Sequence, residues 1–215
     1  ADFIVLKHYD HQGKVVGEHL FMGLYTSAVY NISPFQIPLI RQRVQQVLDR
    51  TGFLPGSHDF KAMRQLIEMH PRAELFHSSA DEWYKTLVCI WQISGRRFVR
   101  LFVRVDPCDK FVNCMVYMPR DIYRTSIRTR IEELLKAEFD AAECEFNTIF
   151  SESILARTQY VLRIDSSRHR EVDLRSLVKR IISITQDLGD ELEEAALEQW
   201  GEEMGRLIGQ TYRDA

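Results

Sequence analysis

The segment from Arg97 to Ile164 alternates apolar and polar residues in short runs, and this alternation constrains the fold more than any other feature. Its first run, 98–105, places four aliphatic residues on one side of an extended chain: Val99, Leu101, Val103 and Val105. Because successive side chains of a strand point to opposite faces, this register predicts one buried face. The runs 111–118, 143–151 and 155–164 predict three further strands, with turns at 106–109 and 152–154.

Two amphipathic helices complete this segment, one at 126–139 and one at 173–187. The resulting order, ββαββα, is the ferredoxin-like unit with its last strand moved to the front. We therefore predict one antiparallel four-stranded sheet with helices on one face. The strand 155–164 should lie next to 111–118, so that the spatial order is first, second, fourth, third. Such sheets are characteristic of small regulatory domains, and nothing in this one is catalytic chemistry.

The chain opens with a predicted β-hairpin, 3–9 paired with 15–26, around a turn at Asp10–Lys14. Gly17 and Gly23 fall on one face of its second strand, which suggests that another backbone approaches closely there. A two-stranded hairpin is marginal in water. This hairpin should need either the helices that follow or strands from outside the chain.

Helical spacing and end signals predict the helices that follow. One runs from Pro38 to a left-handed cap at Gly52, a second covers 59–69, and a third begins at the capping box of Ser79 and Glu82. A last helix is expected at 190–212. The fold class is thus α+β, divided into a β-hairpin segment (1–32), a helical linker region (33–96), a sheet domain (97–187) and a C-terminal helical segment (188–215).

The composition excludes several classes of function. The 215 residues carry a net charge of −3, which gives no electrostatic footprint for nucleic acid or an anionic membrane. No apolar run reaches the roughly 20 residues of a membrane span, and no signal peptide is present. Four cysteines without CxxC spacing indicate free, buried thiols and a cytoplasmic location. Because the chain lacks an initial Met and stops within a helical pattern, we expect it to be cut from a larger protein.

Motifs for catalysis, cofactors and metals are mostly missing. The ten glycines never fall as GxGxxG or GxxxxGK[ST], so no nucleotide cradle and no cofactor are expected in this chain. His8, Asp10, His11 and His19 could in principle ligate a metal, but polar hairpin turns are common and no metal site is predicted. No catalytic residue is assigned.

The link from the second sheet strand into helix 126–139 is the candidate ligand site. A strand-to-helix link presents backbone N–H groups and a helix N-terminus, where an anion or carboxylate can dock. The residues that we assign to it are Arg120, Asp121, Tyr123 and Thr125. The alternative is that Asp121 or Thr125 merely caps the helix.

The second face of strand 98–105 is the candidate interface. It carries Phe98, Arg100, Phe102 and Arg104, and aromatic and arginine residues are enriched at protein–protein contacts. A solvated sheet face is the alternative. If the row is an interface, replacing Phe102 with Ala should change assembly more than it changes the fold.

Several runs of the chain, taken in order, resemble the N-terminal regions of the large bacterial NAD-specific glutamate dehydrogenases. The runs are VGEHLFMGLYTSA (16–28), IPLIR (37–41), TGF (51–53) with PGSHD (55–59), RAELF (72–76), VRLFVR (99–104) with DP (106–107), VYMPRD (116–121), and SES (151–153) with LAR (155–157). Together they cover most of the chain.

The resemblance implies a PAS-associated C-terminal-like hairpin at the start and an ACT-like domain over 97–187. It also implies a cytosolic, homo-oligomeric parent that oxidises L-glutamate with NAD to 2-oxoglutarate, ammonium and NADH. The family's catalytic lysine and NAD-binding domain would lie outside this chain, so its partner would be the catalytic domain of its own parent. Many amino-acid-binding ACT domains carry a glycine in the strand-to-helix link, and this chain has none between Pro119 and Thr125. That departure favours assembly over binding of an amino-acid effector.

Three functions therefore compete. The first is a non-catalytic regulatory and assembly fragment of an NAD-dependent glutamate dehydrogenase. The second is a freestanding amino-acid sensor of the ACT type. The third, a small enzyme in its own right, has no triad, metal set or cofactor loop to support it.

Overall fold

The structure is a computed structural model that describes residues 2–106, 110–151, 153–165, 172–186 and 201. Its internal contacts divide the chain into two compact units, residues 1–92 and 93–215. Among the described residues, no helix is both long and apolar enough to cross a bilayer. Apart from residue 201, the predicted helix at 190–212 lies outside the described part of the chain, as do the turn residues 107–109.

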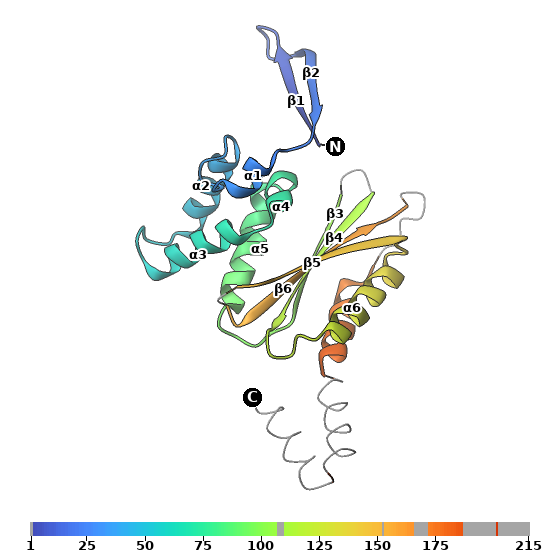
Figure 1. Cartoon of the computed structure of the whole chain (residues 1–215). Coiled ribbons are helices and arrows are strands. Elements are labelled where there is room, and N and C mark those ends of the chain that lie inside the picture. Colours follow the sequence, from blue (N-terminus) through green and yellow to red (C-terminus); the bar gives the residue numbers. More distant parts are fainter. Residues whose placement is uncertain (1, 107–109, 152, 166–171, 187–200, 202–215) are drawn as a thin grey trace. The chain divides into compact units, whose positions relative to one another are not determined.

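The second unit is built on a four-stranded antiparallel sheet in the order β3-β4-β6-β5 (Figure 1). Its strands are β3 (Arg100–Val105), β4 (Phe111–Pro119), β5 (Glu143–Phe150) and β6 (Leu155–Arg163). β6 pairs with β5 through the second hairpin and with β4 along its other edge, from Phe111 opposite Arg163 to Pro119 opposite Leu155. The predicted strand order is confirmed.

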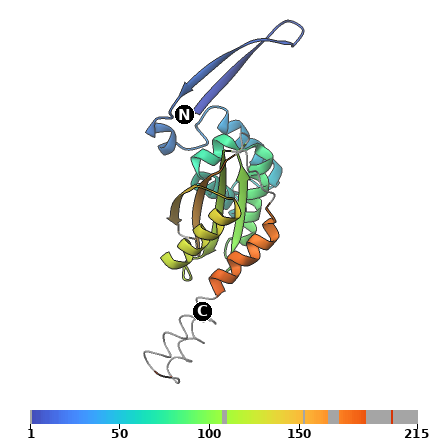
Figure 2. The same ribbon diagram turned by 90° about the vertical axis from the view of Figure 1, so that its right-hand side faces the viewer.

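Two helices cover one face of this sheet: α6 (Thr125–Glu138) and the helix at 174–186 (Figure 2). Both contribute to one core with β4 and β6, in which Ile127, Ile131, Leu135, Leu177 and Ile181 are buried. Val99, Leu101 and Val103 pack against the same core, as their register predicts. Val105, the fourth residue of the predicted buried row, is exposed at the end of β3, so the prediction is wrong at this position. The α+β fold with helices on one face of an antiparallel sheet is therefore confirmed.

The other face of the sheet is not open at its centre. β4 is buried on both faces, because Asn113, Met115 and Tyr117 are buried in addition to their helix-facing neighbours. Asn113 accepts a hydrogen bond from the amide of Gln159 on β6 at 3.0 Å, while its own Nδ2 has no partner. The second face of the sheet is therefore not solvent-exposed along β4.

The first unit contains five helices among its described residues: α1 (Ser27–Asn31), α2 (Ile40–Thr51), α3 (His58–Met69), α4 (Arg72–His77) and α5 (Ala80–Ile93). Their core is a cluster around Val47, Met63, Ile67, Trp83 and Leu87. The three longer helices were predicted. The short helices α1 and α4 were not.

The helix ends follow local chemistry. Gly52 closes α2 with a φ of 67°, which is the predicted left-handed cap. At α5, the backbone N–H of Ser79 donates to Glu82 at 2.7 Å and that of Glu82 donates to the Ser79 hydroxyl at 3.3 Å, which confirms the capping box. The start of α2 differs from the prediction, because Leu39 takes a φ of 64° and the helix begins at Ile40 rather than Pro38.

The β-hairpin is a separate two-stranded sheet of β1 (Asp2–Tyr9) and β2 (Val15–Gly23). Asp10 closes its turn as predicted, since its carboxylate accepts from the backbone N–H groups of Gln12 and Lys14, each at 2.9 Å. β2 ends at Gly23, three residues before the predicted end. Every residue of β2 is exposed.

Candidate functional site

The β4–α6 link, 119–125, is held to the turn of the second hairpin by Arg120. Its backbone N–H donates to the carbonyl of Ile154, and its guanidinium donates to the carbonyl of Ser151, both at 2.9 Å. The guanidinium carbon lies 5.9 Å from the ring centre of Phe150. Arg120 remains exposed, so one side of this cation faces solvent beside the turn that it holds.

Asp121 pairs with Arg97, which comes from the segment before β3. Both side chains are half exposed, so the pair contributes little to stability by itself. The backbone carbonyl of Asp121 accepts from the guanidinium of Arg124 at 2.8 Å. Asp121 therefore ties the link to the start of the sheet, and it does not cap α6.

The N-terminus of α6 has no side-chain cap. Arg124 is the N-cap residue, and its side chain makes no capping hydrogen bond. Thr125 is the first residue of the helix and is exposed. The alternative that Asp121 or Thr125 caps the helix is therefore wrong, since the N-cap position falls between them.

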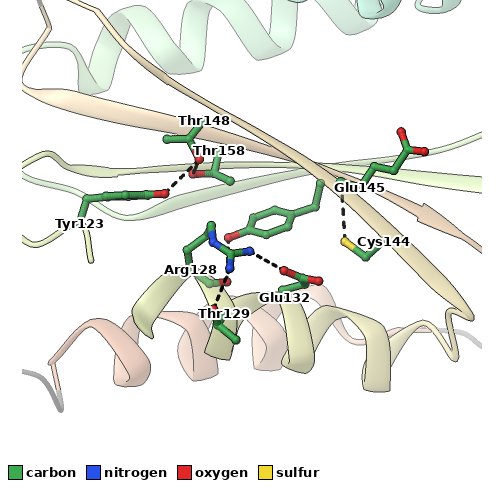
Figure 3. A network of polar contacts seen from close by, with 9 residues as sticks. Tyr123, Arg128, Thr129, Glu132, Cys144, Glu145, Thr148 and Thr158 are labelled. Carbon is green, nitrogen blue, oxygen red and sulfur yellow. Dashed lines mark hydrogen bonds and ion pairs between the residues drawn. The ribbon is translucent and has the colours of Figure 1, made fainter. Parts of the chain in front are cut away.

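Tyr123 begins a line of hydroxyl groups that runs from the link into the sheet (Figure 3). Its hydroxyl lies 3.2 Å from the Oγ1 of Thr148 on β5, which lies 3.0 Å from the Oγ1 of Thr158 on β6. Thr158 is buried, and the Tyr123 ring packs edge-on against Phe150 at 5.0 Å. Tyr123 is thus engaged by the sheet, and its hydroxyl is already hydrogen-bonded.

Arg128, one turn further along α6, fixes this helix against β5 and β6 (Figure 3). Its guanidinium pairs with Glu132, donates to Thr129 at 2.8 Å and stacks 3.8 Å from the ring centre of Phe146. Its backbone carbonyl accepts from the Tyr160 hydroxyl at 3.2 Å. Burial raises the pKa of Tyr160, so this phenol stays protonated as a donor. These contacts serve packing.

The structure therefore brings two of the four predicted link residues, Arg120 and Tyr123, to the β5–β6 hairpin, while Asp121 turns towards Arg97 and Thr125 towards solvent. Sequence reasoning did not find Arg97, Thr148 or Arg128. The spacing of Arg128 and Glu132, four residues apart on a helix, was the one available signal.

The four residues of the candidate interface differ in how far they are exposed to solvent. Phe98 is 51% exposed and precedes β3, and Arg100 is also exposed. Phe102 and Arg104 are partly buried, and the Phe102 ring meets that of Tyr117 edge-on at 5.8 Å. Burial raises the pKa of Tyr117, while Arg157 opposes that rise. The row is therefore half engaged within its own sheet.

No group of three or more His, Cys, Asp or Glu side chains that could hold a metal occurs in the part of the chain that the structure describes. Nδ1 of His19 lies 2.6 Å from Nε2 of His8 on the hairpin. Asp10 is occupied by the backbone of its turn. Cys114 is buried, and Cys89 and Cys144 are partly buried free thiols.

Two family models match the chain, and both describe parts of one enzyme. Residues 37–96, which hold α2–α5, match "Glutamate dehydrogenase, helical motif 1". Residues 100–187, which hold the four-stranded sheet, match "Glutamate dehydrogenase, ACT2 domain". The chain belongs to the glutamate dehydrogenase family. The resemblance drawn from the sequence runs is thereby confirmed.

Similar proteins support the same assignment. The chain is 41% identical over its whole length to the NAD-specific glutamate dehydrogenase of Halomonas elongata, and 38% identical over 96% of its length to that of Pseudomonas aeruginosa. It is 36% identical over 71% of its length to that of Mycobacterium tuberculosis. It spans only 13%, 13% and 9% of these proteins, respectively.

Proposed function

We propose that this chain is a non-catalytic regulatory and assembly region of an NAD-dependent glutamate dehydrogenase. The observation that carries the proposal is the match of almost the entire chain to a small share of much longer enzymes of that name. The parent would convert L-glutamate, water and NAD to 2-oxoglutarate, ammonium and NADH. It would be a cytoplasmic homo-oligomer, and the catalytic residues and NAD site would lie in its other parts.

Within this proposal, the ACT2 domain acts through packing and assembly. Arg120 and Tyr123 point to the β5–β6 hairpin, and Asp121 is paired with Arg97. Side chains that already bind one another stabilise the link and are less available to a ligand. The absence of glycine between Pro119 and Thr125 fits this role.

One observation favours amino-acid binding as a second candidate. The exposed Arg120 lies in the same link as the first turn of α6, where no side chain caps the backbone N–H groups. A cation beside uncapped N–H donors suits a carboxylate. A freestanding sensor and an effector site in a parent enzyme would share this chemistry.

Two measurements on the purified chain test the proposal. Incubation with L-glutamate and NAD should produce no NADH, and any enzymatic production by this chain alone would overturn its non-catalytic role. Calorimetric titration with L-amino acids should give no saturable heat. Saturable heat that is lost in Arg120→Ala but kept in Arg175→Ala, an exposed arginine at the start of the 174–186 helix, would establish the sensor instead.

A further inference from the structure

The β1–β2 ribbon exposes apolar side chains on both of its faces. The register, with Leu6 opposite His19 and Val5 opposite Leu20, assigns each residue to a face. One face carries Ile4, Leu6 and Phe21 beside the two histidines, and the other carries Val5, Leu20 and Met22 beside the pair of Lys7 and Glu18. All six apolar side chains are exposed, and Met22 is 76% exposed. Contiguous apolar surface of this kind marks a contact site.

The ribbon also leaves both of its long edges without a neighbouring strand. Within the described residues, β1 and β2 form a sheet of two strands only. Two-stranded ribbons are marginal in water, and open apolar edges invite pairing with another strand. The ribbon therefore needs a stable partner along the edges of β1 and β2 as well as on its two faces.

The two strand glycines give an independent indication of close approach. Gly17 and Gly23 lie on the same face as Phe21, and neither has a positive φ that would require glycine. A Cβ atom built at either position meets no atom within 4 Å. Glycine weakens a strand unless a backbone or ligand must come close. No atom of the described chain approaches either glycine in this way, so a backbone that does would have to come from elsewhere.

We propose that this ribbon is one part of a larger sheet whose remaining strands, and the apolar layer over it, come from another segment of the same longer polypeptide. A second copy of the chain, paired about a twofold axis, would cover one edge or one face and leave the others open. The relatives offer ample chain, since the matched region is 13% of their length. The inference rests on the proposed function only in placing this chain within a longer protein.

Hydrogen exchange of the 215-residue chain and of the longer polypeptide that contains it tests the inference. The amides of β1 and β2 that face the outer edges have no neighbouring strand among the described residues and should exchange freely in the 215-residue chain. In the longer polypeptide their protection should rise by about a hundredfold or more. The β4–β6 amides, which are paired within this chain, provide the internal reference.

Three outcomes would overturn the inference. The ribbon amides could stay unprotected in the longer polypeptide, or they could already be protected in the dilute 215-residue monomer. They could also become protected in the 215-residue chain only at high concentration, together with a doubled mass, which would identify a second copy as the partner. NADH production by the longer polypeptide is a separate readout, so failure of the proposed enzyme and failure of this sheet are distinguishable.

Gly17→Val should have opposite effects on the order of the ribbon in the 215-residue chain and in the longer polypeptide. In the 215-residue chain a valine here meets open space and favours a strand, so ribbon order should be kept or increased. In the longer polypeptide the same side chain should obstruct the approaching backbone and lower ribbon protection at least about tenfold. His19→Val, on the same face but already bearing a side chain, is the control and should have the smaller effect. Equal effects of Gly17→Val in both proteins would contradict the close approach.

If the Gly17→Val protein does not fold, Leu20→Ser provides a second test of the inference. Leu20 is 62% exposed on the ribbon, and Leu54, in the loop between α2 and α3, is 76% exposed. In the 215-residue chain both Leu→Ser changes should leave thermal stability unchanged. In the longer polypeptide only Leu20→Ser should reduce ribbon protection. If Leu54→Ser reduces it equally, the ribbon has no special partner.

Discussion

The β1–β2 ribbon and the β3–β6 sheet are built from the same sequence pattern, and they end in different states. Both are antiparallel hairpins with alternating apolar residues and a polar turn. The β3–β6 sheet buries its helix-facing residues under α6 and the 174–186 helix, while every residue of β2 is exposed. Alternation therefore predicts where strands form and which residues share a face, but it does not say what will cover that face.

The largest expected difference in the free energy of unfolding is between a leucine of the sheet and a leucine of the ribbon. Leu162→Ala in β6 removes a fully buried side chain and should lower the free energy of unfolding by about 2–5 kcal/mol. Leu20→Ala in β2 should change it by less than about 0.5 kcal/mol. Urea denaturation followed by circular dichroism measures both. Equal losses would mean that the ribbon is as well packed as the sheet.

Phe102 tests whether the second face of β3 serves folding or assembly. Phe102→Ala removes the edge-on contact with Tyr117 and partial burial, and should cost about 1–2 kcal/mol of stability. Phe98→Ala, at the more exposed position, should cost less. If the row is an interface, sedimentation should show weaker self-association in both variants. Unchanged sedimentation with a large fall in melting temperature would assign Phe102 to the fold alone.

A smaller difference in stability is expected between substitutions at the N-terminus of α5 and at the N-terminus of α6. Ser79→Ala breaks the capping box and should destabilise the first unit by about 1 kcal/mol. Thr125→Ala should have almost no effect, because the N-cap of α6 is Arg124 and no side chain caps it. Thermal melting of the two variants measures the difference. A loss at Thr125 as large as that at Ser79 would show that its hydroxyl has a structural role.

The smallest effect concerns Cys144, on the edge strand β5. Burial, with Glu132 adding to it, raises the pKa of this thiol from 9.0 to about 11. Below pH 9 the protonated Cys144 thiol makes its full contribution to the stability of the folded chain. This contribution is lost as the pH rises towards 11. At pH 8, alkylation of Cys144 should be up to about a hundredfold slower in the folded chain than in urea, as peptide mass spectrometry can measure. Equal rates would contradict the raised pKa.

Much of the fold was predictable because its signals are local. The order of the four strands followed from two hairpins with one apolar face each, and the ends of α2 and α5 followed from Gly52 and from the pairing of Ser79 with Glu82. The short helices α1 and α4, of five and six residues, were missed because neither is long enough to show a repeated apolar face. Leu39 also could not be foreseen, since its left-handed φ has no sequence signal.

The candidate site was harder to predict, because its contacts join residues that are distant in the sequence. The link itself was found from the strand-to-helix pattern. The partners of Tyr123 and Asp121, which are Thr148 and Arg97, depend on how the second hairpin and the segment before β3 are placed. A cap at Asp121 or Thr125 was a reasonable local prediction, and it was wrong because the helix begins between them.

The central position of β6, the last of the described strands along the sequence, has a consequence for how this domain folds. Each hairpin joins neighbouring segments, so β3–β4 and β5–β6 can form early and independently. The pairing of β4 with β6 closes a long loop that includes α6, and such non-local pairing is intrinsically slow. We therefore expect β4–β6 contacts to limit the refolding rate, so that Gln159→Ala, which removes the bond to Asn113, slows refolding more than a change in either turn. During synthesis, the inner edge of β4 stays open until the ribosome has released residue 163, and that interval is when the domain is most exposed to mispairing.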